Sequence, residues 1–192
     1  MITAFLEKHV KKFNRKTFAV MLLQMLLIAM AGILFSKSYL PNSAFVFLEF
    51  VVVFAYAKIL FSDLRTAQKK EFWKYALFFG GTALIIQSAW LIDILDIGMS
   101  PFSRFGIVLG AFLLFIAGFR VIYGRKYTAG VVVLSDESIA VVETEFDLLS
   151  FTNAGRHIVE AGKQSREGQK VRVAVDGFLF AGKPKRIEGP VK

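Results

Sequence analysis

The 192-residue sequence contains no cysteine and only two histidines, His9 and His157. The absence of cysteine excludes disulfides, thiolate zinc sites, iron–sulfur clusters and cysteine nucleophiles. The sequence also has no phosphate-binding P-loop, no HExxH, no GxSxG and no pair of histidine ligands. We therefore expect no cofactor, no metal site and no enzymatic activity.

One enzymatic alternative stays open. Ser150, His157 and Asp147 could form a serine–histidine–aspartate site, because such triads are recognised by geometry and not by their order in the chain. A lone histidine in a β segment is more often structural. A membrane enzyme acting on lipid head groups is therefore the weakest of the functional hypotheses.

The sequence is rich in apolar residues and basic charge. Hydrophobic residues make up 55% of it, mean hydropathy is +0.55 and net charge is +9. Residues 1–123 carry 13 Lys/Arg and 6 Asp/Glu, a net charge of +7, whereas residues 124–192 carry 11 and 9, a net charge of +2. Long apolar blocks end at the same point, so we place a boundary near Gly124.

Residues 17–123 hold four apolar blocks that approach the length of about 20 residues needed to cross a bilayer as a helix. These blocks are Thr17–Phe35, Ser43–Phe61, Tyr75–Ile92 and Phe105–Phe119, and the last reaches Tyr123 if Arg120 extends its charge toward the interface. A soluble helical bundle would need polar faces, and these blocks are apolar all round. We predict an α-helical membrane bundle of four transmembrane helices.

Basic residues in the short loops predict the orientation, because such residues collect on the cytoplasmic side. Five precede the first block, four lie between the second and third, and two follow the fourth, whereas the other two loops hold only Lys37 and Arg104. This alternation predicts a multi-pass protein of the cell (plasma) membrane with both termini in the cytoplasm. A three-span arrangement would break the pattern.

Residues 1–16 form a basic amphipathic segment. Apolar side chains such as Phe5 and Val10 fall on one helical face, and the basic residues lie elsewhere. We expect this segment to contact anionic lipid head groups. An ordinary basic flank and a signal peptide cleaved near Ala29-Met30-Ala31 are the alternatives. The predicted lipid-surface residues are Lys8, Lys11, Lys12, Arg15 and Lys16.

Polar residues within or beside the spans form a candidate intramembrane site, because an intramembrane charge usually has a function. Its members are Glu49, Gln87, Asp93 and Asp96. A proton or cation path could use them. The alternative is a structural role, with a hydrogen bond between Glu49 and Gln87 or a salt bridge to Arg104 or Lys37. We see neither several midplane acids nor an internal repeat, which favours the structural role.

Small residues in the third and fourth blocks predict close helix packing. Gly106 and Gly110 form a GxxxG pair in the fourth, and Gly80 and Gly81 lie in the third. Packing within the bundle is the preferred interpretation, and a homo-oligomer contact is the alternative.

Residues 124–192 have a β pattern. Tyr127–Leu134 and Ser138–Thr144 are rich in Val and Ile, and Val171, Val173 and Val175 alternate with other residues. Asp176-Gly177 follows as a hairpin signal before Phe178-Leu179-Phe180. Further short strands are expected at His157–Glu160 and Lys185–Ile187. We predict a small all-β OB- or SH3-like barrel, with an open sheet as the alternative.

The order of spans and β tail, with the segment Gly168-Gln169-Lys170-Val171-Arg172-Val173 and Asp176-Gly177, resembles the NfeD-type membrane proteins. That resemblance implies an OB-fold tail and a stomatin-like scaffold as partner. The segment from Phe146 to Gly155 and the closing Lys183–Ile187 look more like a small uncharacterised archaeal family of membrane proteins, which implies no activity.

We therefore predict a non-enzymatic membrane protein whose β tail, residues 124–192, binds a protein partner or steadies an assembly. The alternative is a small transporter or channel subunit that uses Glu49 and Asp93. Nucleic-acid binding is not expected, because acidic residues nearly cancel the positive charge of the tail.

Overall fold

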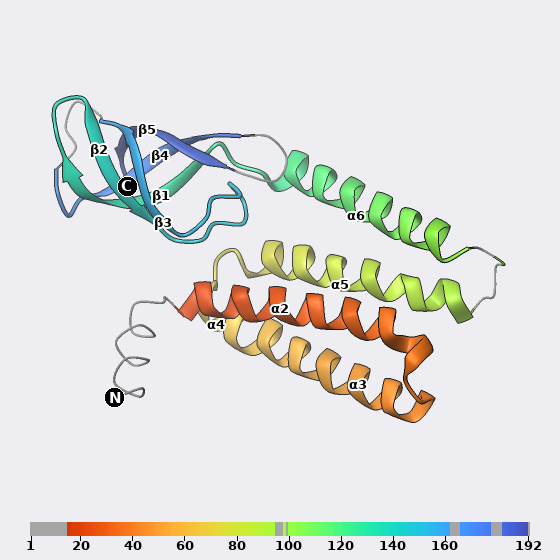
Figure 1. The fold of residues 1–192 in the computed structure, drawn as a ribbon. Coiled ribbons are helices and arrows are strands. Elements are labelled where there is room, and N and C mark those ends of the chain that lie inside the picture. The colour runs from red at the N-terminus through yellow and green to blue at the C-terminus, as the bar shows by residue number, and fades with distance from the viewer. Residues whose placement is uncertain (1–14, 95–97, 99, 162–165, 178–181, 192) are drawn as a thin grey trace. The chain divides into compact units, whose positions relative to one another are not determined.

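The computed structural model describes residues 15–94, 98, 100–161, 166–177 and 182–191. The chain forms two compact units that divide between Ile116 and Ala117. The first unit is helical, and the second holds the five strands together with the end of the last helix (Figure 1).

The described part of the chain contains four helices that are long and apolar enough to cross a membrane. This confirms the four predicted spans. The helical elements are α2 (Arg15–Ser36), η1 (Lys37–Tyr39), α3 (Asn42–Lys58), η2 (Ile59–Leu64), α4 (Arg65–Ala67), α5 (Phe72–Ile94) and α6 (Pro101–Tyr123).

The second span is longer than the sequence predicted. The π-helical segment η2 joins α3 to α4 without a break, so one apolar helix runs over Asn42–Ala67. Ser62 and Asp63 lower the local hydropathy, which is why the predicted block ended at Phe61. The helix continues because Leu60 and Leu64 are buried on one side of it.

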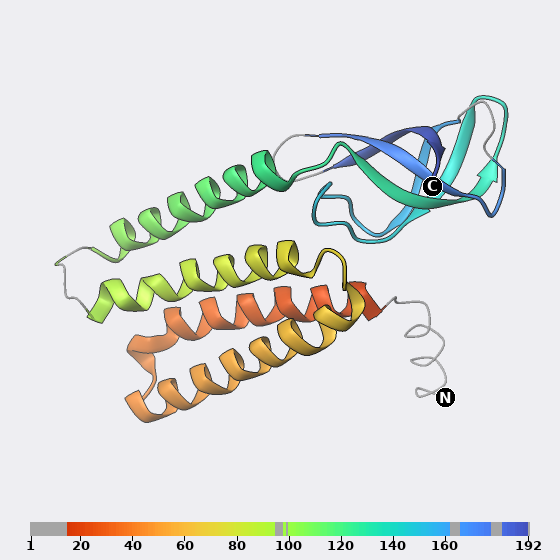
Figure 2. The same ribbon diagram turned by 180° about the vertical axis from the view of Figure 1, so that it is seen from behind.

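Helix α2 lies between α3 and α5 in the first unit (Figures 1 and 2). Leu23 of α2 and Tyr75 and Phe79 of α5 are almost completely buried. Only 11–22% of each span is buried inside the protein, so most of its apolar side chains are left to face lipid. Helices suit this setting because every backbone hydrogen bond is made within the segment.

Two close contacts fix α5 against its neighbours. The Tyr56 hydroxyl of α3 donates a hydrogen bond of 2.7 Å to the Phe79 carbonyl. The ring of Phe115 in α6 lies over Gly81, where an added Cβ would come within 2.5 Å of the ring. The prediction that small residues allow close helix approach is confirmed at Gly81. A Cβ at Gly80 would meet nothing within 4 Å.

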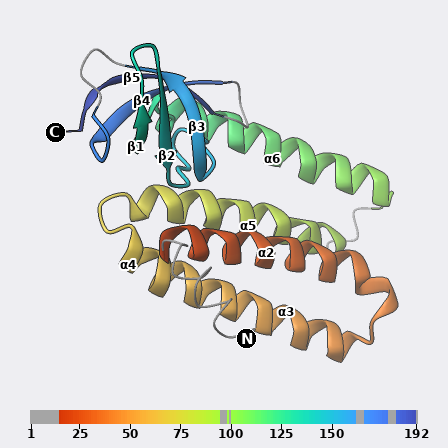
Figure 3. The ribbon, with the colours of Figure 1, turned by 60° about the vertical axis from the view of Figure 1, so that its left-hand side comes forward.

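The second unit contains a closed five-stranded barrel with the strand order β1-β2-β3-β5-β4 (Figure 3). The strands are β1 (Tyr127–Ser135), β2 (Ile139–Thr144), β3 (Gly155–Glu160), β4 (Lys170–Asp176) and β5 (Lys183–Pro190). All neighbours pair antiparallel except β3 and β5, which are parallel. The predicted small barrel is confirmed, and the open-sheet alternative is wrong.

Alternation along the strands fills the barrel. Val132, Val142, Val159 and Val173 are almost fully buried and form its core with Ala140, Val171 and Ile187. Strands β4 and β5 pair antiparallel with Asp176 opposite Lys183, so the strand that pairs with β4 begins later than the hairpin predicted at Asp176-Gly177. The predicted run Phe178–Phe180 lies outside the described residues.

Candidate functional site

The intramembrane polar site is centred on Glu49 of α3. The Gln87 side chain of α5 donates a hydrogen bond to Glu49 Oε1. The second carboxyl oxygen, Oε2, is buried and has no hydrogen-bond partner among the described residues. A buried oxygen of this kind normally has a partner, so it is an unusual feature of the bundle.

The structure does not describe a larger acidic cluster at this site. Asp93 lies in the last turn of α5, but its side chain is not among those described, and Asp96 lies outside the described residues. Within the described part of the chain, no group of three His, Asp or Glu side chains is arranged to hold a metal ion.

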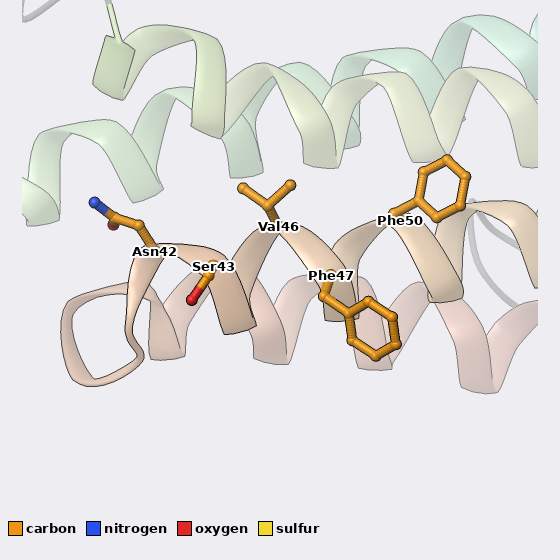
Figure 4. A pocket seen from close by; sticks show the side chains of 5 residues that line it. All are labelled: Asn42, Ser43, Val46, Phe47 and Phe50. Carbon is orange, nitrogen blue, oxygen red and sulfur yellow. The ribbon is translucent and has the colours of Figure 1, made fainter.

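A shallow groove lies on the first turns of α3 (Figure 4). Asn42, Ser43, Val46, Phe47 and Phe50 line it, and all five are exposed. They come from a single helix, and Glu49 is not among them. This groove is therefore a feature of the exposed surface of α3.

The GxxxG pair of α6 points to open space. A Cβ added at Gly106 or Gly110 would meet nothing within 4 Å in the described chain. Aromatic side chains of α6 contact the bundle instead, because the ring centres of Phe105 and Phe35, and those of Phe115 and Phe78, lie 6.1 Å apart. The homo-oligomer contact through the two glycines stays a prediction.

Most of the predicted lipid-surface residues lie outside the part of the chain that the structure describes. Lys8, Lys11 and Lys12 lie outside the described residues, and Arg15 begins α2 with a side chain that is not described. Lys16 is 9% exposed, and its ammonium lies 5.6 Å from the centre of the Tyr75 ring. Contact of this segment with anionic lipid stays a prediction.

A buried ion pair lies where α6 meets the barrel. Both Nη2 and Nε of Arg125 donate to Asp147 Oδ2, at 2.8 and 3.2 Å. The Ser150 hydroxyl donates to the same oxygen at 2.7 Å, and the Leu149 amide donates to Oδ1 at 3.2 Å. Asp147 is 3% exposed, so these donated hydrogen bonds replace the water that its carboxylate has lost.

The charge state of Asp147 follows from these contacts. Burial raises the pKa of its carboxyl, but the Arg125 guanidinium and hydrogen bonds from Ser150, Arg125 and Thr128 outweigh burial and hold the pKa below its ordinary value. Asp147 is therefore a carboxylate at neutral pH. The sequence had singled it out only as a triad member, because nothing in the chain pattern points to Arg125.

The barrel is also tied to the last turn of α6. Arg120 Nη2 donates to the Gly177 carbonyl at 2.8 Å, and its guanidinium lies 5.2 Å from the Phe151 ring centre. The Arg125 amide donates to the Leu149 carbonyl at 2.8 Å. Only three residues separate α6 from β1.

The contacts of the three triad candidates differ from those of a catalytic triad. The Ser150 hydroxyl, 1% exposed, donates directly to Asp147. The His157 ring nitrogen Nε2 lies 3.2 Å from the Asn153 carbonyl. In a triad the histidine stands between the serine and the acid, so these contacts favour a structural role for Ser150 and Asp147.

The outer face of β1, β2 and β3 carries exposed aliphatic side chains. Leu134 is 58% exposed, Ile139 52% and Ile158 74%. Leu134 pairs with Val141, and Val141 pairs with Ile158, so these three form a row across the strands. We name Leu134, Ile139, Val141 and Ile158 the aliphatic patch. The alternation along each strand could have shown that these side chains face outward. The sequence does not show that they lie next to one another, because they come from three different strands.

Carboxylates surround one end of the aliphatic patch. Asp136 and Glu137 lie in the exposed turn between β1 and β2, and Glu160 is exposed opposite Ile139. At the other end Glu143 pairs with Arg156 at 3.6 Å. The patch is thus apolar at its centre and acidic at one margin.

Comparison with known proteins agrees with this architecture. The family model described as "Predicted membrane protein (DUF2101)" matches residues 3–188. Neither the curated proteins nor the solved structures include a match to the chain. The family match covers both the four helices and the barrel, and the chain therefore belongs to the DUF2101 family of predicted membrane proteins.

Proposed function

We propose that this protein is a membrane-anchored interaction module, in which four spans hold a barrel that docks a protein partner. The aliphatic patch is the observation that carries this proposal. Isolated exposed aliphatic residues are common on protein surfaces, but neighbouring ones on adjacent strands form a patch of the kind found at interaction sites.

The chemistry of the patch defines the partner. Complete burial of a fully exposed Leu or Ile side chain contributes about 1.5–3 kcal/mol. Because Leu134, Ile139 and Ile158 are between 52% and 74% exposed, burial of their exposed parts would together contribute roughly 3–5 kcal/mol to binding. The carboxylates at its margin favour basic residues on the partner and oppose acidic ones. The expected partner presents an apolar surface with Lys or Arg at one side.

The same proposal includes the location of the barrel. Basic loops favour a cytoplasmic barrel and a cytoplasmic N-terminus in the cell membrane. The resemblance in layout to NfeD-type proteins, in which a tail barrel accompanies a stomatin-like scaffold, supports a scaffold protein as partner. The barrel would then steady an assembly at the cytoplasmic surface.

Site-specific photocrosslinking tests the proposal. A photoreactive amino acid at position 139 of the full-length protein in native membranes should form a discrete crosslinked product. The Ile158→Asp change should weaken that product by about tenfold or more, because it removes an apolar contact and adds a charge.

The control is Val191→Asp, which makes the same change at an aliphatic side chain that is 47% exposed but outside the patch. It should leave the product unchanged. A product equally strong with Ile158→Asp, or none at all, would contradict the proposal.

A second candidate function is transport through the membrane region. The buried Oε2 of Glu49, without a partner in the described chain, favours this candidate because a proton or cation could occupy that position. The Glu49–Gln87 hydrogen bond favours a structural role instead. Cation or proton flux into proteoliposomes should be lost in Glu49→Gln if the protein transports. Unchanged or absent flux would exclude this candidate.

A further inference from the structure

The first strand of the barrel begins with an aromatic residue that lies close to two arginines. The Arg172 guanidinium lies 3.6 Å from the centre of the Tyr127 ring, and the Arg125 guanidinium lies 5.3 Å from it. Residue Lys126, next to Tyr127, is exposed. We name Arg125, Lys126, Tyr127 and Arg172 the Tyr127 site. We propose that the Tyr127 site binds the phosphate of an anionic phospholipid head group.

The charge of the Tyr127 site supports an anionic ligand. Arg125 is neutralised by Asp147, but no described carboxylate forms an ion pair with Arg172. Asp176, near the end of β4, pairs instead with Lys185 at 3.8 Å. The site therefore has a net charge of about +2 from Lys126 and Arg172.

The stacking of Arg172 suits phosphate binding. A guanidinium that lies flat on an aromatic ring keeps its N–H groups free at its edge, where they can donate to two oxygens of one phosphate. Stacking also restricts the side chain before the ligand arrives, which lowers the entropy lost on binding. A lysine at the same position would keep the charge but lose the planar pair of donors.

The length of the chain keeps the Tyr127 site close to the end of the last span. The span Phe102–Tyr123 has 22 residues, or about 33 Å of helix, which matches a hydrocarbon core of about 30 Å. Tyr127 follows Tyr123 by four residues, so it lies at most about 14 Å beyond the span. The head-group layer is roughly 5–8 Å thick on each side.

The barrel is also held near the span. The Arg120 bond to Gly177 joins the last turn of α6 to the residue that follows β4. The Arg125 bond to Asp147 joins the connection between α6 and β1 to the segment between β2 and β3. The Val175 amide donates to the Lys126 carbonyl at 2.8 Å, which fixes the start of β1 beside β4. Arg172 is therefore kept within reach of the head groups, and lipid is the phosphate source that this geometry favours.

Fluorescence quenching in nanodiscs tests the site. Because the protein has no cysteine, an Ala129→Cys change gives one labelling position, exposed and directly opposite Arg172 in the β1–β4 register. The full-length protein carries a fluorophore at this position. Its quenching by nitroxide-labelled phosphatidylglycerol is compared with its quenching by nitroxide-labelled phosphatidylcholine in separate nanodiscs. Phosphatidylglycerol should quench about 30-fold more at equal mole fraction, as roughly 1 kcal/mol for each of Lys126 and Arg172 implies.

Three variants define the result. Arg172→Ala should reduce the difference between the two lipids to about fivefold, the contribution of Lys126 alone. Arg172→Lys should give a difference between that value and the one for the unsubstituted protein. Arg166→Ala, at another exposed arginine, should leave the difference unchanged. Equal quenching by the two lipids in the unsubstituted protein, full retention in Arg172→Lys, or the same loss in Arg166→Ala would overturn the proposal.

A competition arm separates lipid from soluble phosphate. Millimolar inorganic phosphate, compared with sulfate-free chloride buffer of the same ionic strength, should not reduce the preference for phosphatidylglycerol. Loss of the preference in phosphate would assign the site to a soluble anion and would overturn the lipid assignment. Hydrogen exchange of the barrel in each variant would confirm that it is folded.

Discussion

The ion pair between Arg125 and Asp147 should contribute strongly to the stability of the barrel. In Asp147→Asn, an amide nitrogen at the position of Oδ2 would face three donors, two from Arg125 and one from Ser150. The charge of Arg125, whose side chain is 25% exposed, would then be left without its partner. Removing one member of a buried ion pair costs about 3–5 kcal/mol, and the partial exposure of Arg125 reduces this to roughly 2–4 kcal/mol.

Amide hydrogen exchange of the full-length protein in detergent measures this loss directly. A decrease of roughly 2–4 kcal/mol corresponds to protection factors about 30- to 1,000-fold lower in barrel peptides that contain Val142 and Val173. Peptides from α2, in the other compact unit, should keep their protection and serve as the internal reference.

The matched control is Asp176→Asn. Asp176 makes a surface ion pair with Lys185 at 3.8 Å, and both side chains are well exposed, so this change should cost about 0–1 kcal/mol. If Asp147→Asn and Asp176→Asn lowered protection equally, the buried ion pair would not have the role that we assign to it.

Further predictions concern pH and helix packing. Folding lowers the pKa of Asp147, so its stabilising effect should be present above about pH 4 and should be lost as pH falls through the lower pKa of the folded state. Acid titration of barrel stability should show this loss in the natural protein and not in Asp147→Asn. Gly81→Ala should destabilise the bundle by about 1–3 kcal/mol relative to Gly80→Ala, because only Gly81→Ala places a Cβ against the Phe115 ring. Thermal unfolding in detergent compares the two variants, and equal melting temperatures would refute the packing argument.

The spans could be predicted from sequence because they depend on composition alone. A block such as Tyr75–Ile92 needs only enough apolar length, whatever it packs against. The end of the second span could not be predicted, because Asp63 lowers hydropathy in a segment that burial of Leu60 and Leu64 keeps helical. The strands were equally predictable, since alternation at Val171, Val173 and Val175 reports which side chains face a core.

The candidate sites were harder to predict, because they depend on contacts between distant residues. The Glu49–Gln87 hydrogen bond is one of the structural alternatives that the sequence offers, and the structure shows it. The pairing of Asp147 with Arg125 across 22 residues has no sequence signature. The stacking of Arg172 on Tyr127 arises only when β1 and β4 close the barrel.

The proposal that the four spans anchor a barrel that binds a cytoplasmic partner depends on which side of the membrane the barrel occupies. Single cysteines introduced for Ile158, in the aliphatic patch, and for Asn42, at the start of α3, can be labelled with a membrane-impermeant maleimide in intact cells. The account predicts labelling of the Asn42→Cys protein in intact cells and of the Ile158→Cys protein only after the membrane is opened. Labelling of the Ile158→Cys protein in intact cells would contradict a cytoplasmic barrel.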